Sequence, residues 1–144
     1  MQLKRSAQAH WLGAARNGEG TFTTDSKTLN NSAFSFPSRF ETGDGTNPEE
    51  LIAAAHAGCY SMALSFILAK DGIKSEVIDT TATVTIEAVG QGFEITAVHL
   101  AVTGKVPGID EETFKAYTEM AKTGCAVSKL IKAAISMESK FISG

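Results

Sequence analysis

The sequence predicts an α+β fold in a single domain that spans residues 1–144. Segments of alternating apolar and polar residues come in hairpin-connected groups, without the regular alternation of strand and helix that a parallel sheet requires. In addition, 144 residues, 43% of them hydrophobic, suffice for one core. We therefore expect three strands, a helix, two strands, two helices and a last strand.

The first three strands are predicted before residue 41. Residues 7–12 and 20–24 flank Asn17-Gly18, a dipeptide typical of hairpin turns. Residues 34–40 alternate aromatic with small or polar side chains, which predicts a third strand. Because Pro37 cannot donate a ladder hydrogen bond, this strand must be an edge strand or a strand end.

A long helix is predicted over residues 48–70. Asn47 suits its N-cap, Glu49 and Glu50 lie at the positive end of its dipole, and Gly72 suits the residue after its end. We interpret Glu50 as the N3 partner of the Asn47 cap.

This helix is apolar or small on nearly every face, so it must be buried on all sides. A chain of 144 residues with a few short strands would struggle to cover it, and we expect a partner subunit to pack on it. The apolar and small residues are Leu51, Ile52, Ala53, Ala54, Ala55, Ala57, Met62, Ala63, Leu64, Phe66, Ile67 and Leu68.

The second half predicts another hairpin and a final strand. Residues 79–87 and 93–102 alternate on either side of the turn at residues 90–92. Residues 133–141 are expected to form the last strand. Between them, Asp110 suits the N-cap of a helix that runs to about residue 123.

The two cysteines are the candidate reactive residues. Cys59 lies near the middle of the apolar helix, and Cys125 follows Gly124 at the start of a short helix, where backbone N–H groups favour a thiolate. Burial would raise the pKa of Cys59, so a catalytic Cys59 needs a positive neighbour, for which Arg39 is the best candidate. A free cysteine is often an inert core residue, and position alone leaves that alternative open for both thiols.

Three other functions remain open from the residues alone. His56 lies three residues before Cys59 on the same helical face, which suits a Cys-His hydrolase but offers no orienting partner for the imidazole. The His56 and Cys59 pair, with Cys125 and either His10 or His99, suits a zinc site, although close-spaced ligand pairs such as Cys-x-x-Cys are missing from the sequence. A non-enzymatic carrier of a hydrophobic ligand would need only the aromatic strand and the apolar helix.

Composition limits the partners and the compartment. The net charge of −3 and the pI near 5.6 argue against a nucleic-acid partner, which requires a basic surface. The N-terminus lacks the apolar segment of a signal peptide, and we expect no stretch close to the roughly 20 apolar residues of a membrane span. We therefore expect a cytoplasmic protein with no membrane partner, in which two cysteines are more often redox-active or buried than a permanent disulfide.

Two motifs resemble the osmotically inducible protein C and organic hydroperoxide resistance (OsmC/Ohr) family, and most closely its OsmC branch. One is Thr46-Asn47-Pro48-Glu49-Glu50-Leu51 followed by Cys59, and the other is Gly124-Cys125-Ala126-Val127-Ser128. Many relatives are expected to carry proline where this chain has Ala126. The resemblance covers essentially the whole chain and extends to residues 9–11, 38–41 and 106–110.

The resemblance implies a small dimeric thiol peroxidase without metal, flavin or other cofactor. It implies that Cys59 is the peroxidatic and Cys125 the resolving cysteine, and that Glu49 is the carboxylate partner of Arg39. The expected reaction reduces organic hydroperoxides, and hydrogen peroxide less well, through a Cys59 sulfenic acid and a Cys59–Cys125 disulfide. An external dithiol of the lipoyl type would reduce that disulfide, and the role would be defence against oxidative and osmotic stress. The implied fold is an intertwined homodimer with antiparallel sheets wrapped around central helices.

Helix geometry constrains this site. Glu49 and Cys59 are ten residues apart, which places them about 15 Å apart along a straight helix. Either the helix breaks after its first turns, or Glu49 reaches the thiol from the other subunit. We favour the second alternative.

Overall fold

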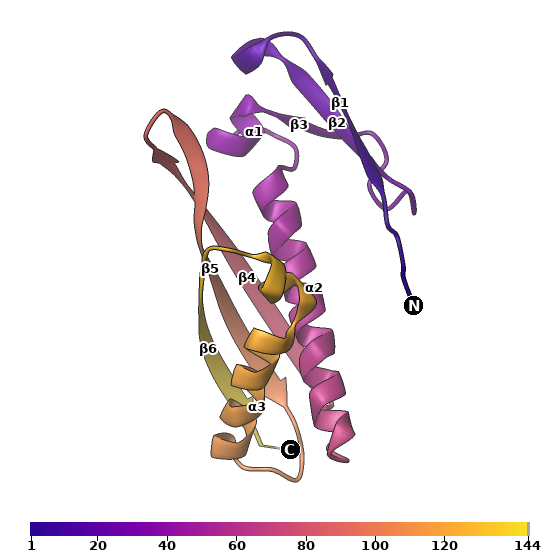
Figure 1. The fold of residues 1–144 in the computed structure, drawn as a ribbon, viewed down its shortest axis with the longest axis vertical. Helices are drawn as coiled ribbons and strands as arrows, with labels where there is room; N and C mark the ends of the chain where they lie inside the picture. The colour runs from indigo at the N-terminus through magenta and orange to yellow at the C-terminus, as the bar shows by residue number, and fades with distance from the viewer. Residues whose placement is uncertain (144) are drawn as a thin grey trace. The chain divides into compact units, whose positions relative to one another are not determined.

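The chain forms two compact units, which meet within one long helix (Figure 1). The computed structural model describes residues 1–143. The first unit is Met1–Leu51 and the second begins at Ile52. Helix α2 (Pro48–Lys70) runs without a break through this boundary. That the two units form one domain stays a prediction.

The first unit holds a three-stranded antiparallel sheet. Its strands are β1 (Ala7–Leu12), β2 (Glu19–Thr24) and β3 (Ser32–Ser35), in that order. The predicted hairpin between the first two strands is confirmed. Its connection is longer than a two-residue turn, because the 3-10 turn η1 (Ala15–Asn17) precedes Gly18.

The predicted strand over residues 34–40 is wrong in its second half. Strand β3 ends at Ser35, and the next residues form the short helix α1 (Phe36–Phe40). The Ser35 hydroxyl accepts from the Ser38 N–H at 3.2 Å, and the Ser38 hydroxyl accepts from the Ser35 N–H at 2.8 Å. This capping box, with Pro37 in the first turn, outweighs the aromatic alternation that suggested a strand. Arg39 therefore lies on a helix.

Helix α2 has the predicted boundaries and caps. The Asn47 side chain accepts from the Glu50 N–H at 2.8 Å, which confirms the N-cap and its N3 partner. Gly72 follows the last turn with a φ of +76°, a left-handed conformation that glycine adopts without strain.

The second unit holds a mixed sheet of β4 (Val77–Val89), β5 (Gly92–Lys105) and β6 (Ala134–Ile142). The predicted hairpin of β4 and β5 is confirmed, and the two strands are antiparallel. Strand β6 pairs with β5 in parallel, so the expectation of purely antiparallel sheets is wrong for this pair. The reason is the helical connection between β5 and β6, which returns the chain to the sheet in the same direction.

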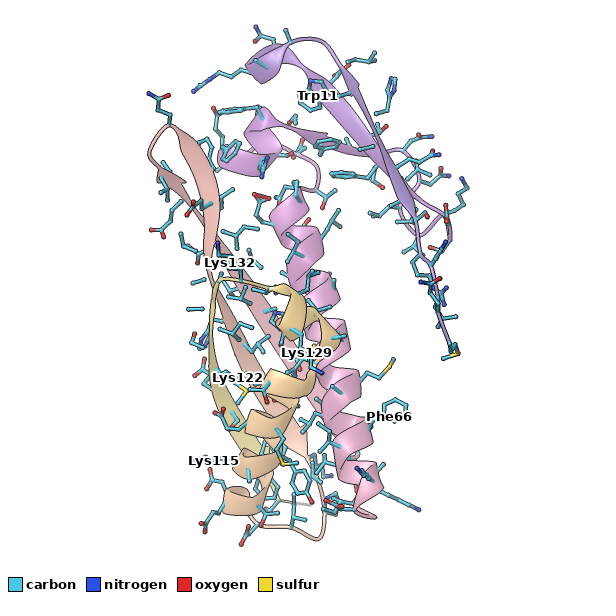
Figure 2. The ribbon with its side chains drawn as sticks, in the orientation of Figure 1. Trp11, Phe66, Lys115, Lys122, Lys129 and Lys132 are labelled. Carbon is cyan, nitrogen blue, oxygen red and sulfur yellow. The ribbon has the colours of Figure 1, made fainter. Side chains whose placement is uncertain are left out.

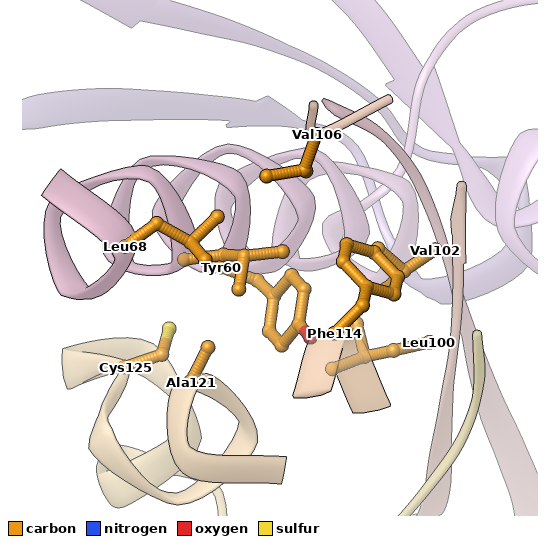
Figure 3. Close-up of a cluster of buried hydrophobic side chains, with 9 residues drawn as sticks. Tyr60, Leu68, Leu100, Val102, Val106, Phe114, Ala121 and Cys125 are labelled. Atoms are coloured by element: carbon orange, nitrogen blue, oxygen red, sulfur yellow. The ribbon is translucent and has the colours of Figure 1, made fainter. Parts of the chain in front are cut away.

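Helices α2 and α3 and the sheet enclose the core of the second unit. Helix α3 (Glu111–Gly124) begins at the predicted cap, where Asp110 accepts from the Thr113 N–H at 2.8 Å. It is followed by the short helix α4 (Ala126–Leu130). Figure 3 shows the core side chains of α2, α3 and the sheet pointing toward one another. The buried cluster consists of Tyr60, Leu64, Leu68, Leu100, Val102, Val106, Phe114, Ala121 and Cys125.

A second face of α2 carries exposed apolar and small residues at every fourth position. We call Ala54, Gly58, Met62 and Phe66 the α2 stripe. Met62 and Phe66 are 64% and 69% exposed, and Phe66 projects away from α3 (Figure 2). A methyl group added at Gly58 would meet no atom within 4 Å.

Helix α2 is also long and apolar enough to cross a membrane by length and composition, so the expectation that no segment approaches this limit is wrong. Core helices of soluble proteins meet the same criterion. Opposite its stripe, α2 buries Tyr60, Leu64 and Leu68 completely in the core of the second unit.

Candidate active site

The two cysteine sulfurs lie side by side in the second unit. Cys125 Sγ is 2.9 Å from Cys59 Sγ, although 66 residues separate them in the chain. Both are free thiols, Cys59 partly accessible and Cys125 buried. A contact this close allows a sulfur–sulfur bond to form with little movement of the backbone.

The junction of α3 and α4 places Cys125 against Cys59. Cys125 has extended backbone angles, with φ −62° and ψ 132°, and it ends α3 and caps α4. The chain changes direction there, and the first N–H groups of α4 have no partner within their own helix. The N–H groups of Ala126 and Val127 instead bond the Cys59 sulfur.

These contacts favour the thiolate of Cys59. Burial raises its pKa, but hydrogen bonds from Cys125 and from the N–H groups of Val127 and Ala126 outweigh burial and lower the pKa below its usual value. The sequence prediction that Cys59 needs a cation overlooked these backbone donors.

Cys125 shows the opposite behaviour. Burial raises the pKa of its thiol, and so does its hydrogen bond to Cys59, while weaker hydrogen bonds from Ser128 and Val127 act against them. Cys59 therefore ionises first and Cys125 keeps its proton. The two thiols therefore differ: the surroundings of Cys59 favour its thiolate, and Cys125 is a hydrogen-bond donor.

Arg39 and Glu49 form an ion pair in the first unit. Arg39 Nε donates to both oxygens of Glu49, at 2.8 and 3.2 Å. The Glu49 side chain is only 8% exposed, whereas that of Arg39 is 37% exposed. The guanidinium carries further N–H donors on its two terminal nitrogens. The Arg39 guanidinium also lies over the Phe40 ring, at 5.0 Å from its centroid.

The path from Glu49 to Cys59 runs along an unbroken α2. Ten residues of helix separate them by about 15 Å along the axis. Helix α2 is assigned from Pro48 to Lys70 and shows no break between Glu49 and Cys59, so the alternative that we favour, Glu49 from another subunit, stays a prediction.

An apolar pocket in the second unit is lined by residues that neighbour Cys59 in the fold, although Cys59 itself is not part of its lining. Ala55 lies one turn before Cys59 on the same face of α2, and Val127 bonds that sulfur through its N–H. Both residues line the pocket, which has a volume of about 340 Å³. Its lining consists of Ile52, Ala55, Ile95, Val98, Val127, Leu130, Ile131, Lys132 and Ala133.

His56 bonds Ser128 instead of Cys59. It is fully buried, and its Nε2 lies 2.8 Å from the Ser128 Oγ. Burial lowers the pKa of His56, so its ring stays neutral near pH 7. Ser128 lies three residues after Cys125, and nothing in the sequence marks it as the partner of His56.

The histidines proposed as zinc ligands have other neighbours. His99 Nδ1 lies 2.6 Å from the Ser136 Oγ, and its Nε2 lies 3.1 Å from Glu138. Within residues 1–143, no group of His, Cys, Asp and Glu side chains is arranged to hold a metal ion.

The OsmC-like protein family matches residues 41–140 of this chain, and several known proteins resemble it. Peroxiredoxin OsmC of Escherichia coli (strain K12) is 47% identical over 138 residues, which cover 96% of each chain. The organic hydroperoxide resistance protein of Xanthomonas axonopodis pv. citri is 34% identical over 87 residues, covering 60% of this chain and 59% of that protein. The crystal structure of the organic hydroperoxide resistance protein OhrB of Bacillus subtilis has a TM-score of 0.66 at 26% identity, covering 95% of this chain and 98% of that chain.

Proposed function

Since the chain belongs to the OsmC-like protein family and is a cysteine-based peroxidase, we propose that Cys59 is its peroxidatic cysteine and Cys125 its resolving cysteine. The contact of the two sulfurs at 2.9 Å, with the pKa lowered at Cys59 and raised at Cys125, carries this assignment. The chemistry uses the chain's own thiols, so we propose no metal or organic cofactor.

The proposed reaction has three steps. The Cys59 thiolate attacks the distal oxygen of the hydroperoxide, the O–O bond breaks, and the alkoxide leaves as an alcohol after gaining a proton. Cys59 is then a sulfenic acid, and the Cys125 sulfur attacks the Cys59 sulfur to form a disulfide with release of water. An external dithiol reduces the disulfide by thiol–disulfide exchange, and a lipoyl-type dithiol is our proposed reductant.

We propose that the active site is completed by a second copy of the chain. Glu49 and Cys59 lie too far apart on α2 to share one Arg39 in a single chain. Ala54 is midway between them in the sequence, and it belongs to the exposed α2 stripe. Two antiparallel copies of α2 that cross at Ala54 would bring Glu49 and Arg39 of each chain beside Cys59 of the other.

The α2 stripe suits such a crossing. Ala54 and Gly58 are small, so two helix backbones can approach closely at the two-fold axis. Met62 and Phe66 extend the stripe and are covered by nothing within the described part of the chain. A homodimer in the cytoplasm, rather than a lipid bilayer, is therefore our proposed environment for this face.

The apolar pocket indicates the preferred substrates. Organic hydroperoxides gain roughly 0.8 kcal/mol for each CH₂ group that the pocket buries, whereas hydrogen peroxide gains nothing from it. The proposed role is reduction of organic hydroperoxides during oxidative and osmotic stress. A kcat/KM for cumene hydroperoxide no higher than that for hydrogen peroxide would contradict this role of the pocket.

The two cysteine roles can be tested by trapping the sulfenic acid. Peroxide should convert Cys59 to a sulfenic acid that accumulates in Cys125→Ser, because the resolving thiol is missing. Cys59→Ser should form none, since the remaining thiol has a raised pKa. A sulfenic-acid probe with peptide mass spectrometry measures both. A sulfenic acid at Cys125, formed in Cys59→Ser at the wild-type rate, would reverse the assignment.

A further inference from the structure

The buried pair of His56 and Ser128 has no part in the proposed reaction. His56 is completely buried and Ser128 is 7% exposed, so neither can contact a hydroperoxide directly. Two polar side chains in an apolar core are costly unless they are hydrogen-bonded. His56 Nε2 and Ser128 Oγ lie 2.8 Å apart. A hydrogen bond from the Ser128 side chain is also among the causes that act on the pKa of Cys125, where it favours the thiolate.

The directions of these hydrogen bonds follow from the number of available protons. Cys125 donates its S–H to Cys59, so its sulfur can accept from Ser128. A serine hydroxyl has one hydrogen. When that hydrogen points to Cys125, the Ser128 oxygen must accept from His56, and the His56 proton must be on Nε2.

The unpaired atom of the ring agrees with this direction. His56 Nδ1 is the one buried side-chain nitrogen or oxygen in residues 1–143 without a hydrogen-bond partner. With the proton on Nε2, Nδ1 carries only a lone pair. A buried acceptor without a partner is tolerated better than a buried N–H without one.

We propose that His56 and Ser128 are positioning residues that hold the Cys125 proton toward Cys59. The chain of donors runs from His56 Nε2–H through the Ser128 hydroxyl and the Cys125 thiol to the Cys59 sulfur. Each donor polarises the next, which strengthens the final bond to the thiolate. The proposal rests on the cysteine roles proposed above.

Of the titratable side chains near the chain of donors, His56 and Tyr60 are uncharged near pH 7, and Glu119 is acidic. Burial lowers the pKa of His56 and keeps it neutral. Tyr60 donates to the Thr118 carbonyl at 2.9 Å, and burial with the nearby Glu119 and Cys125 raises the pKa of its phenol. The pair therefore acts on Cys59 through the direction of its hydrogen bonds and not through a positive charge.

The test is the pH dependence of Cys59 alkylation by iodoacetamide in the reduced full-length protein. Peptide mass spectrometry separates Cys59 from Cys125. In Ser128→Ala the donor to Cys125 is lost, and the midpoint for Cys59 should move to higher pH by about half a unit to one unit, the effect of one net hydrogen bond. Ser128→Thr keeps the hydroxyl and should restore the wild-type midpoint.

Two variants of His56 distinguish a side chain that donates a hydrogen bond from one that accepts a proton. Gln can place an N–H close to the position of Nε2 but cannot accept a proton there, whereas Leu offers neither. His56→Gln should keep the wild-type midpoint, and His56→Leu should shift it as Ser128→Ala does. The matched control is Thr118→Val, a buried polar residue of the same core whose hydroxyl bonds the Lys115 carbonyl. Its midpoint should not move.

Three outcomes would overturn the proposal. The first is an alkylation midpoint of Cys59 that stays unchanged in both Ser128→Ala and His56→Leu. The second is a shift of that midpoint in His56→Gln as large as in His56→Leu. The third is a shift in Thr118→Val as large as in Ser128→Ala. Alkylation requires no peroxide, so failure of this proposal is distinct from failure of the proposed function. If Cys59 were not the peroxidatic cysteine, sulfenic acid trapping would fail while the alkylation shifts would remain. Circular dichroism at each pH confirms that every variant is folded.

Discussion

At the residue scale, the two thiols differ because their hydrogen-bond partners differ. Cys59 accepts from three donors and ionises readily, whereas Cys125 is buried and donates its proton. No full positive charge is among the causes that lower the pKa of Cys59. These causes belong to a single chain. In the proposed dimer, Arg39 of the other copy would add a positive charge that lowers the pKa of Cys59 further, and it would bind the hydroperoxide oxygens.

The first prediction concerns the pH profile of the reaction with peroxide. A lowered pKa means that the Cys59 thiolate is present at pH values where an ordinary thiol is protonated, and that the rate falls as pH drops through this pKa. Cys125→Ala removes one donor to a charged group, which is worth roughly 1.5–3 kcal/mol, so the midpoint should rise by about one unit or more. Stopped-flow measurement of Cys59 oxidation checks this.

Cys125→Ser is the matched control for that variant. Its hydroxyl can donate to Cys59, so the midpoint should stay nearer to the wild-type value than in Cys125→Ala. The same midpoint in the Ala and Ser variants would show that the hydrogen bond from residue 125 does not tune Cys59.

At the element scale, the junction of α3 and α4 determines the environment of Cys59. Cys125 ends one helix and begins the next, so its side chain and two N–H groups of α4 reach one sulfur. Helix α4 is only five residues long, yet its first turn supplies donors that a continuous helix would have used internally.

The second prediction concerns Ala126, where many relatives are expected to carry proline. Ala126 is the first residue of α4, a position that favours proline, and Cys125 has the extended backbone that proline requires before it. Ala126→Pro should therefore fold. It removes one N–H donor to Cys59, so the alkylation midpoint of Cys59 should rise, by less than in Cys125→Ala because this N–H is the weakest of the three donors.

The control for Ala126→Pro is Ala126→Gly, which keeps the N–H. Its alkylation midpoint should match that of the wild-type protein, while α4 loses a small amount of stability. If the alkylation midpoint of Cys59 instead falls in Ala126→Pro, ordering of the first turn of α4 by proline lowers the pKa of Cys59 more than loss of the Ala126 N–H raises it.

Most elements could be predicted from local signals in the sequence. The caps at Asn47 and Asp110 and the glycine after α2 gave helix boundaries that the structure confirms. The short helix α1 was missed because its serine capping box competes with an aromatic alternation typical of strands. The parallel pairing of β6 was missed because strand direction depends on the path of the chain through α3 and α4.

The candidate site was predictable only in part. The resemblance indicated Cys59, Cys125 and Glu49, and the need of a buried thiolate for a cation indicated Arg39. The structure pairs the two cysteines with each other and Arg39 with Glu49. The backbone donors of α4 and the bond between His56 and Ser128 had no signal of their own in the sequence. They arise from tertiary packing, which brings α4 against the middle of α2.

At the scale of the whole molecule, the exposed α2 stripe and the distance along α2 lead to the same conclusion. The stripe has small residues at its centre and large apolar residues further along, as expected for close contact between two helices. The same crossing point lies midway between Glu49 and Cys59. The second copy of the chain that we propose would cover the exposed α2 stripe and would also bridge the distance between Glu49 and Cys59.

The third prediction is recovery of activity in mixed dimers. Cys59→Ser and Glu49→Ala should each be inactive alone, since every site of the homodimer lacks one essential group. When the two variants are unfolded and refolded together, one site of each heterodimer should regain both an intact Cys59 and an intact Glu49 from opposite chains. Peroxidase activity of the mixture should therefore exceed that of either variant.

The control is native mass spectrometry, which counts the heterodimers. If heterodimers form and activity does not rise, Glu49 acts on the Cys59 of its own chain, and the crossing at Ala54 is wrong. A mixture of Cys59→Ser with Cys125→Ser provides the comparison, because both substitutions then affect the same pair of thiols.

The two cysteines are 66 positions apart in the chain, and this separation has a consequence for the lifetime of the protein. A disulfide across a segment of this length restricts the unfolded chain and stabilises the folded state by about 4 kcal/mol in the chain-entropy description. Each turnover would thus alternate between a cross-linked form that resists proteases and a reduced form that opens more readily. The supply of reductant would then set the rate of catalysis and also how long each molecule survives degradation.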